Sequence, residues 1–323
     1  MPGLFTPLKI GSVELRNRVV LPPMATEKST KDGFPTEELY EHYENQSKGP
    51  GLVIVEHSYV SRKGKLSSNQ LGIYSDEHVK KLSKLSDVIK SKGAVSAIQI
   101  NHAGGACKRK VTGKKVVAPS DAYFEDVEPL TVREMESIKD DFVQAAKRAV
   151  EAGFDAVEVH GAHGFLLGQF LSPLTNQRDD EYGGEKLDDR MRFPLEVVER
   201  VKEVVGDALL LYRLGATDMD ENGLTVEGSK IFAEELEKSG VDIIDVSGNL
   251  SGSRLDKDEQ GYFVPIAEEI KSVVGVPVIG VGGITEPSYA DEIVRDKKVD
   301  LVAVGRQQWK NPDWVDDAKK ELT

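Results

Sequence analysis

The sequence contains a single cysteine, Cys107, among 323 residues. One thiol cannot form an intramolecular disulfide or supply the ligands of a cysteine-bound iron–sulfur cluster or zinc site. We therefore interpret Cys107 as an ordinary free thiol. The chain also lacks a run of about 18 apolar residues, which a membrane-spanning helix needs, and its first residues lack the pattern of a signal peptide. These absences predict a cytoplasmic protein without a membrane partner.

Positive charge is in deficit as well, because 42 Lys and Arg residues face 55 Asp and Glu residues and leave a net charge of −13. Such a balance disfavours a broad surface for nucleic acid or for anionic lipid, although it permits a local basic site for a phosphate. Hydrophobic residues make up 39% of the chain, enough for a sizeable core. We expect a globular protein that acts on a small molecule.

Short apolar runs recur along the chain, and each is followed by a segment able to form a helix. Residues 8–20 alternate around Gly11 and Ser12, which indicates a hairpin before the first buried strand. The predicted buried strands are 19–21, 51–55, 95–100, 155–160, 209–213, 243–246, 277–281 and 301–304. Eight such units predict an α/β fold, a (β/α)8 TIM barrel in one domain over residues 1–323. No Gly-x-Gly-x-x-Gly turn follows the first strand, which argues against an open doubly wound sheet.

Active sites of such barrels lie at the carboxyl ends of the strands. The residues predicted there are Pro23, Met24, Ala25, His57, Gln99, Asn101, His102, His160, His163, Arg213, Ser247, Gly282, Gly283, Gly305 and Arg306. The glycines after the last two strands allow close approach of a phosphate, and Arg306 would add a charge-assisted hydrogen bond. Glycines also occur in turns for steric reasons alone.

His160 and His163 follow one buried strand at a spacing of three residues. Two imidazoles directed at one oxygen suit the polarisation of a carbonyl group, where negative charge develops during reaction. The pair could instead bind a metal, but no third ligand lies close in the sequence, so we predict no metal site. Either histidine could also satisfy a backbone group in the core.

Arg213 ends a hydrophobic strand, and a buried arginine is costly without an anionic or electron-rich partner. The sequence leaves two partners open, a structural carboxylate and a flavin ring whose reduced form is negative. Gln99 has both a donor and an acceptor and could bind the imide edge of that ring.

Several motifs resemble the old yellow enzyme family of FMN-dependent NAD(P)H oxidoreductases, and the resemblance covers essentially the whole chain. They are NRVVLPPM (17–24), GLVIVE (51–56), IQINHAG (98–104), HGAHGFLLGQFLSPLTNQRDDEYGG (160–184), Arg190 with Arg192 and Phe193, GGI (282–284), and GRQ (305–307) with Pro312. The resemblance implies a single FMN-binding barrel that is reduced by NADPH or NADH, and it allows a homo-oligomer.

The resemblance also implies roles for individual residues. Pro23, Met24 and Ala25 would lie along the flavin. His57 is unusual for the family at the end of its strand, and we predict that it also binds the cofactor. Gln99 and Arg213 would bind its pyrimidine edge, and Gly282, Gly283, Gly305 and Arg306 its phosphate. His160 and His163 would bind the carbonyl oxygen of the substrate, with His160 also touching the cofactor. The implied reaction is ping-pong reduction of an activated alkene.

Besides His57, four positions depart from the family pattern. Phe165 stands where a tyrosine commonly protonates the α-carbon, and a missing general acid typically costs ~10²–10⁴-fold in rate. Ala25 replaces a redox-tuning cysteine of one branch, and Glu27 replaces its active-site tyrosine. Glu27 could donate the proton and contact substrate if burial raised its pKa, or it could be a solvated loop residue. Gly105 replaces an arginine often seen after the HAG motif.

Three functions follow from this pattern. The first is an ene-reductase that acts on α,β-unsaturated carbonyl compounds. The second is an NAD(P)H oxidase or another flavin enzyme whose acceptor is not an enone, in which Phe165 is tolerated because no carbon is protonated. The third is a barrel that binds flavin or a phosphosugar without redox turnover. The sequence does not identify the natural acceptor or choose between NADH and NADPH.

Overall fold

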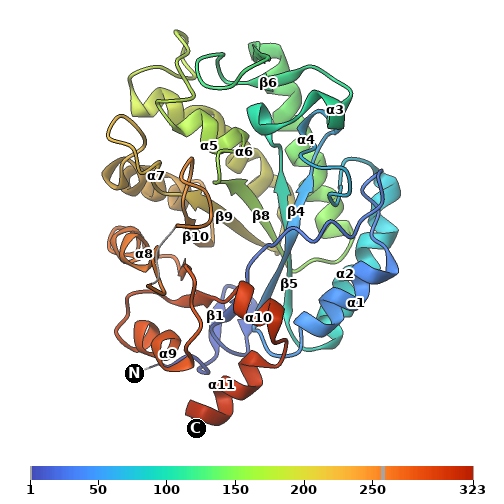
Figure 1. The fold of residues 1–323 in the computed structure, drawn as a ribbon, viewed down its shortest axis with the longest axis vertical. Coiled ribbons are helices and arrows are strands. Elements are labelled where there is room, and N and C mark those ends of the chain that lie inside the picture. Colours follow the sequence, from blue (N-terminus) through green and yellow to red (C-terminus); the bar gives the residue numbers. More distant parts are fainter. Residues whose placement is uncertain (1, 256–258, 323) are drawn as a thin grey trace.

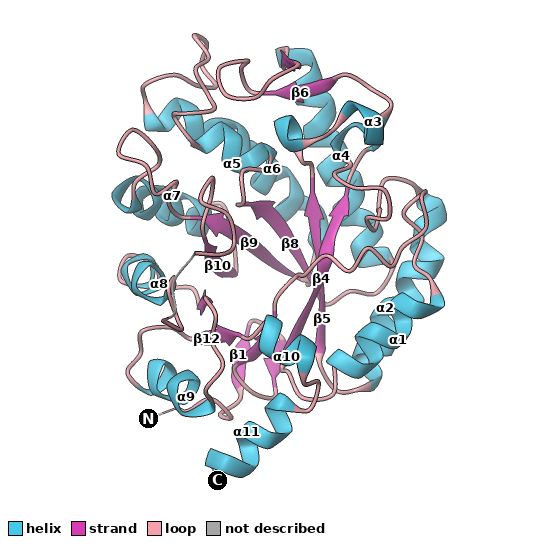
Figure 2. Cartoon of the chain, viewed as in Figure 1, coloured by secondary structure: helices cyan, strands magenta, loops and turns pink. Residues whose placement is uncertain are grey.

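The computed structural model describes residues 2–255 and 259–322, which form a closed barrel of eight parallel strands (Figures 1 and 2). In chain order the barrel strands are β3 (Val19–Leu21), β4 (Leu52–Tyr59), β5 (Val95–Asn101), β8 (Ala156–Gly161), β9 (Leu209–Gly215), β10 (Ile243–Ser247), β11 (Val278–Gly280) and β12 (Leu301–Ala303). Each strand pairs with the next, and β12 pairs with β3 to close the barrel. The predicted TIM barrel and its eight strands are confirmed.

Helices surround the barrel and cover the outward faces of its strands (Figure 1). The longer ones are α1 (Glu37–Gln46), α2 (Val79–Ser91), α4 (Val132–Glu151), α6 (Leu187–Val205), α7 (Val226–Lys238), α8 (Val264–Lys271), α9 (Pro287–Arg295) and α11 (Trp314–Leu322). The start of α4 shows why they begin where they do. Thr131 accepts from the backbone N–H of Glu134, and the Glu134 carboxylate accepts from the N–H of Thr131, which forms a capping box. No helix in the described ranges is long and apolar enough to cross a membrane.

The barrel interior is apolar toward the amino-terminal ends of the strands. Its side chains include Val20, Leu52, Ile54, Ala97, Ala156, Leu209, Leu211, Ile243, Ile279, Leu301 and Ala303. The predicted hairpin is present as β1 (Leu8–Ile10) paired with β2 (Val13–Leu15), and Ile10 and Leu15 pack onto this cluster. Alternate residues of a strand share a face, so the next inward positions are Glu56, Gln99, Glu158, Arg213 and Asp245. Polar side chains therefore occupy the barrel interior toward the carboxyl ends of the strands.

Two long connections lie at the carboxyl end of the barrel. The segment from Cys107 to Pro129 contains a short helix α3 (Arg109–Thr112) and a parallel pair of strands, β6 (Val116–Ala118) and β7 (Val127–Pro129). Strands of three residues leave too little periodicity to be detected in the sequence. Three 3₁₀ turns also occur, η1 (Arg62–Gly64), η2 (Asp76–His78) and η3 (Gly104–Ala106).

The second connection follows β8 and contains α5 (Leu166–Leu171). Asn176 fixes it by donating to the carbonyl oxygens of Phe170 and Tyr182 at 2.7 and 2.8 Å. Arg190 on α6 donates to the carbonyl of Leu171 at 3.0 Å and to those of residues 184 and 185. The polar residues of this motif thus hold the loop that begins at the histidine pair.

Candidate active site

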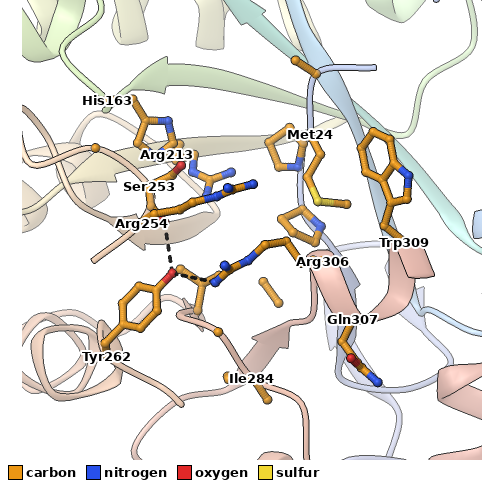
Figure 3. Close-up of a pocket in the computed structure, with 18 of the residues that line it drawn as sticks. Met24, His163, Arg213, Ser253, Arg254, Tyr262, Ile284, Arg306, Gln307 and Trp309 are labelled. Atoms are coloured by element: carbon orange, nitrogen blue, oxygen red, sulfur yellow. Dashed lines mark hydrogen bonds between the residues drawn. The ribbon is translucent and has the colours of Figure 1, made fainter. Parts of the chain in front are cut away.

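A cavity of about 1050 Å³ opens at the carboxyl end of the barrel. Most of the predicted site residues line it, namely Pro23, Met24, Ala25, His57, His163, Phe165, Arg213, Gly283, Gly305 and Arg306. Figure 3 shows His163 and Arg213 on one side of this space and Met24 and Trp309 on another, with Arg306 extending toward it. The predicted residues that do not line it are Glu27, Gln99, Asn101, His102, His160, Ser247 and Gly282.

The two histidines meet at the end of β8. Their ring centroids lie 5.0 Å apart and nearly perpendicular, and the Phe165 ring lies 5.0 Å from His160. The turn requires His163 to adopt a left-handed backbone conformation, with φ of 58°. Burial, together with the charge of Arg213, holds the pKa of each ring well below its usual range, so both imidazoles are neutral.

The hydrogen bonds of these rings indicate what each can offer a ligand. His160 Nδ1 accepts from the N–H of Ala162 at 3.3 Å, which places the proton of the neutral ring on Nε2. His163 Nε2 lies 2.9 Å from the Ser247 hydroxyl, and Nδ1 has no hydrogen-bond partner within residues 2–255 and 259–322. The same described residues contain no group of three side chains able to hold a metal ion.

Arg213 has a carboxylate partner and also lines the cavity. Its Nε lies 3.5 Å from Oδ2 of Asp245, which faces it in register on β10. The Nε atom nevertheless lacks a hydrogen bond. The two partners that the sequence left open are therefore compatible, because Asp245 balances the charge while the guanidinium still borders the cavity.

Gln99 binds a buried carboxyl group. Its Nε2 donates to Glu158 Oε1 at 2.8 Å, and the two residues are in register on β5 and β8. Burial, followed by repulsion from Asp245, raises the pKa of Glu158 well above its usual range. Because one guanidinium serves two buried carboxyl groups, Glu158 is the protonated member.

Sequence reasoning missed the acidic residues Glu56, Glu158 and Asp245, although the strand pattern contained a signal for them. Each stands two residues after an apolar residue of the barrel interior and so faces inward. Glu56 accepts from the N–H of Thr26 at 2.8 Å and fixes the segment that follows Ala25. Burial raises the pKa of Glu56 to about 7.

Glu27 is exposed and is not among the residues that line the cavity. Its carboxylate accepts from the Ser67 hydroxyl and from the N–H of Asn69, the latter at 3.2 Å. The burial that a proton-donor role required is absent. The solvated loop residue, the other possibility for Glu27, agrees with this placement.

The far end of the cavity is basic. Arg306 Nη2 donates to the Tyr262 hydroxyl at 3.3 Å, and that hydroxyl donates to the Ser253 carbonyl at 3.2 Å (Figure 3). Gly283 lines the space with φ of 62°. Gly282 serves a steric need instead, because a Cβ there would lie 2.7 Å from the backbone nitrogen of Tyr262.

These features fit a flavin mononucleotide. Arg306 and Gly283 could hold its phosphate, and the side of the cavity formed by Pro23, Met24 and Ala25 offers an apolar surface to a ring. Arg213 lines the cavity, and its guanidinium could donate to an electron-rich edge of that ring.

Comparisons with known proteins agree with this fit. The model of the NADH:flavin oxidoreductase / NADH oxidase family matches residues 3–323. The NADPH dehydrogenase of Geobacillus sp. (strain WCH70) is 40% identical over 325 residues, covering 99% of this chain and 94% of that protein. The NADH oxidase of Thermoanaerobacter brockii is 42% identical over 332 residues, covering 99% of this chain but only 51% of that protein.

A solved structure, the old yellow enzyme homologue from Zymomonas mobilis, superposes with a TM-score of 0.88 at 25% identity. The match covers 100% of this chain and 94% of that one. The resemblance to the old yellow enzyme family is thus confirmed at the level of sequence and of fold.

Proposed function

Because the chain belongs to the NADH:flavin oxidoreductase / NADH oxidase family, whose members bind FMN and use NADH or NADPH, we propose that it reduces the C=C bond of α,β-unsaturated carbonyl compounds. The observation that carries this proposal is the pair of neutral imidazoles, His160 and His163, beside the cavity that Arg213 and Arg306 border. Bound FMN supplies hydride to the β-carbon of the acceptor.

The protein residues would position the acceptor and stabilise charge. The N–H of His160 and a ring nitrogen of His163 bind the carbonyl oxygen, where negative charge grows as hydride arrives. Neutral rings suit this task because they donate hydrogen bonds without needing a counterion in a buried site. Pro23, Met24, Ala25 and His57 would border the cofactor, and Arg213 and Gln99 would bind its pyrimidine edge. Gly283, Gly305 and Arg306 would hold its phosphate, with Gly282 shaping the turn beside them.

A second function keeps the cofactor but changes the acceptor. Phe165 has no proton to give, and one relative is named an NADH oxidase, so oxygen or another acceptor that needs no carbon protonation is the alternative. Family membership makes the chain an oxidoreductase, so it argues against the third function, a barrel that binds flavin or a phosphosugar without redox turnover.

Anaerobic stopped-flow absorbance separates the two functions. The FMN-loaded protein is reduced with NADPH, or with NADH in a parallel series, and is then mixed with 2-cyclohexenone. We expect the flavin absorbance to bleach and then to return rapidly with the enone. Return with oxygen alone would contradict the enone proposal and support the alternative.

A variant tests the binding role of the histidines. We expect the double change of His160 and His163 to alanine to abolish the spectral shift that phenols cause on binding near oxidised flavin, because the oxygen loses both partners. The flavin content of the variant should match that of the unchanged protein. Unaltered phenol binding would show that the oxygen binds elsewhere.

A further inference from the structure

His57 at the carboxyl end of β4 is held by Gln70, whose amide orientation is fixed. The backbone N–H of Leu66 donates to Gln70 Oε1 at 2.7 Å. The other end of the amide must therefore be its NH₂ group. That group lies 3.1 Å from the His57 carbonyl oxygen and 2.6 Å from ring Nδ1.

This arrangement determines the tautomer of His57. An NH₂ group can only donate, so Nδ1 accepts, and a neutral ring carries its proton on Nε2. The ring is neutral because burial lowers its pKa to about 4. His57 lines the cavity, and no residue of the described ranges forms a hydrogen bond with its Nε2. A buried N–H donor is thus left for a ligand.

The donor stands beside the residue that departs from the family pattern. The His57 ring centroid lies 5.6 Å from that of Phe165 and 6.4 Å from that of His160. His57, Phe165 and His163 therefore line the cavity together, and the His160 ring packs against them. Glu27 does not border this space, and the Tyr262 hydroxyl is occupied by the Ser253 carbonyl.

We propose that His57 donates, from Nε2, the proton that Phe165 cannot supply to the α-carbon of the acceptor. This inference rests on the proposed ene-reductase function. As hydride bonds to the β-carbon, a C–H bond forms at the α-carbon and the Nε2–H bond breaks, leaving its electron pair on nitrogen. Water in the cavity then returns a proton to Nε2 and leaves as hydroxide, which the solvent neutralises. A neutral imidazole can act in this way where its environment favours loss of the proton.

Two neighbours of His57, Gln70 and Arg213, favour that loss. The amide NH₂ of Gln70 donates to Nδ1 and would stabilise negative charge on the ring. The positive charge of Arg213 acts on the ring in the same direction, whereas the larger effect of the Glu27 carboxylate opposes it. Gln70 and Arg213 are therefore positioning residues for the donor.

Three variants test the proposal in single-turnover reoxidation by 2-cyclohexenone. We expect His57→Ala to slow reoxidation of the reduced enzyme by ~10²-fold or more, the usual contribution of a general acid. His57→Gln retains an N–H donor but cannot transfer its proton, so it should be equally slow. Adding Phe165→Tyr to His57→Ala should restore the rate, because the hydroxyl replaces the lost donor.

The solvent deuterium isotope effect gives a second measurement. It should be present in the unchanged protein and reappear in the Phe165→Tyr rescue. If His57→Ala reoxidised as fast as the unchanged protein with the same isotope effect, the role of His57 would be overturned. Failure of the rescue would also overturn it, since His57 would then act by shaping the cavity. Absence of reoxidation in the unchanged protein would instead remove the proposed function.

A measurement without turnover tests the tautomer. Nitrogen NMR of labelled histidine should show the His57 proton on Nε2 from about pH 5 to about pH 8. Gln70→Leu removes the donor to Nδ1 and should shift the population toward the other tautomer. A proton on Nδ1 in the unchanged protein would overturn the proposal even if the enone is reduced.

Discussion

Arg213 Nε lies 3.5 Å from Asp245 Oδ2 across adjacent strands of the barrel, and both side chains are almost completely buried. The carboxylate of Asp245 thus balances the positive charge of Arg213, which borders the cavity. Glu158 lies next to this pair, with its proton retained because a second buried carboxylate would have no counterion.

The first prediction concerns that ion pair. Asp245→Asn should lower the free energy of unfolding of the apoprotein by about 3 kcal/mol, because it leaves Arg213 buried without its carboxylate. Urea denaturation at neutral pH measures this loss. Glu158→Gln is the matched control and should lose far less, since its carboxyl is already neutral and Gln99 keeps an acceptor. Equal losses would mean that Glu158 carries the counter-charge.

The second prediction is a pH dependence of stability at Glu56. Burial raises the pKa of this carboxyl in the folded protein from 4.5 to about 7. The folded state therefore binds the proton more tightly, and the stability that this proton contributes is lost as pH rises through about 7. Glu56→Gln removes the dependence. Relative to the unchanged protein, it should gain up to about 3 kcal/mol between acidic and alkaline pH. Parallel curves of stability against pH would contradict this.

The third prediction concerns the basic end of the cavity. Arg306→Ala should weaken FMN binding by roughly 10- to 100-fold, the value of a charge-assisted hydrogen bond to phosphate, and should leave riboflavin binding almost unchanged. Fluorescence titration of the apoprotein measures both ligands. Lys310→Ala is the control, because Lys310 also lines the cavity. A parallel loss for riboflavin would place the phosphate elsewhere.

The fourth prediction separates Glu27 from the chemistry. Because its carboxylate is exposed and bound to Ser67 and Asn69, Glu27→Gln should change neither the rate of reoxidation by more than about twofold nor its pH profile. Steady-state rates measured across the pH range check both. A shift of the pH profile in Glu27→Gln would indicate that Glu27 donates the proton.

The sequence was sufficient for the barrel because its strands are short apolar runs between helices with clear ends. It also placed His57, His163, Arg213 and Arg306 at one cavity, since parallel strands of a barrel bring their carboxyl ends together. The sequence could not place Glu27, because the direction of this side chain depends on a left-handed backbone conformation and on partners about forty residues away.

The acidic interior was predictable only in part. Alternation along the strands puts Glu56, Glu158 and Asp245 inside the barrel, but their protonation depends on how many cations lie within reach. The bond between Gln70 and His57 was beyond sequence reasoning as well, because a loop thirteen residues downstream forms it. Polar contacts of this kind follow from the fold and are not encoded by local periodicity.

The hairpin packs Ile10 and Leu15 onto the apolar interior of the barrel, at the end opposite the cavity, and so helps to close that end. We expect NAD(P)H and the acceptor to enter and leave through the same opening. NAD(P)H would then also occupy the reduced enzyme, which reacts with the acceptor, and the acceptor would also occupy the oxidised enzyme, which reacts with NAD(P)H. A high concentration of either partner should then slow turnover, and the physiological ratio of nicotinamide to acceptor would set the flux.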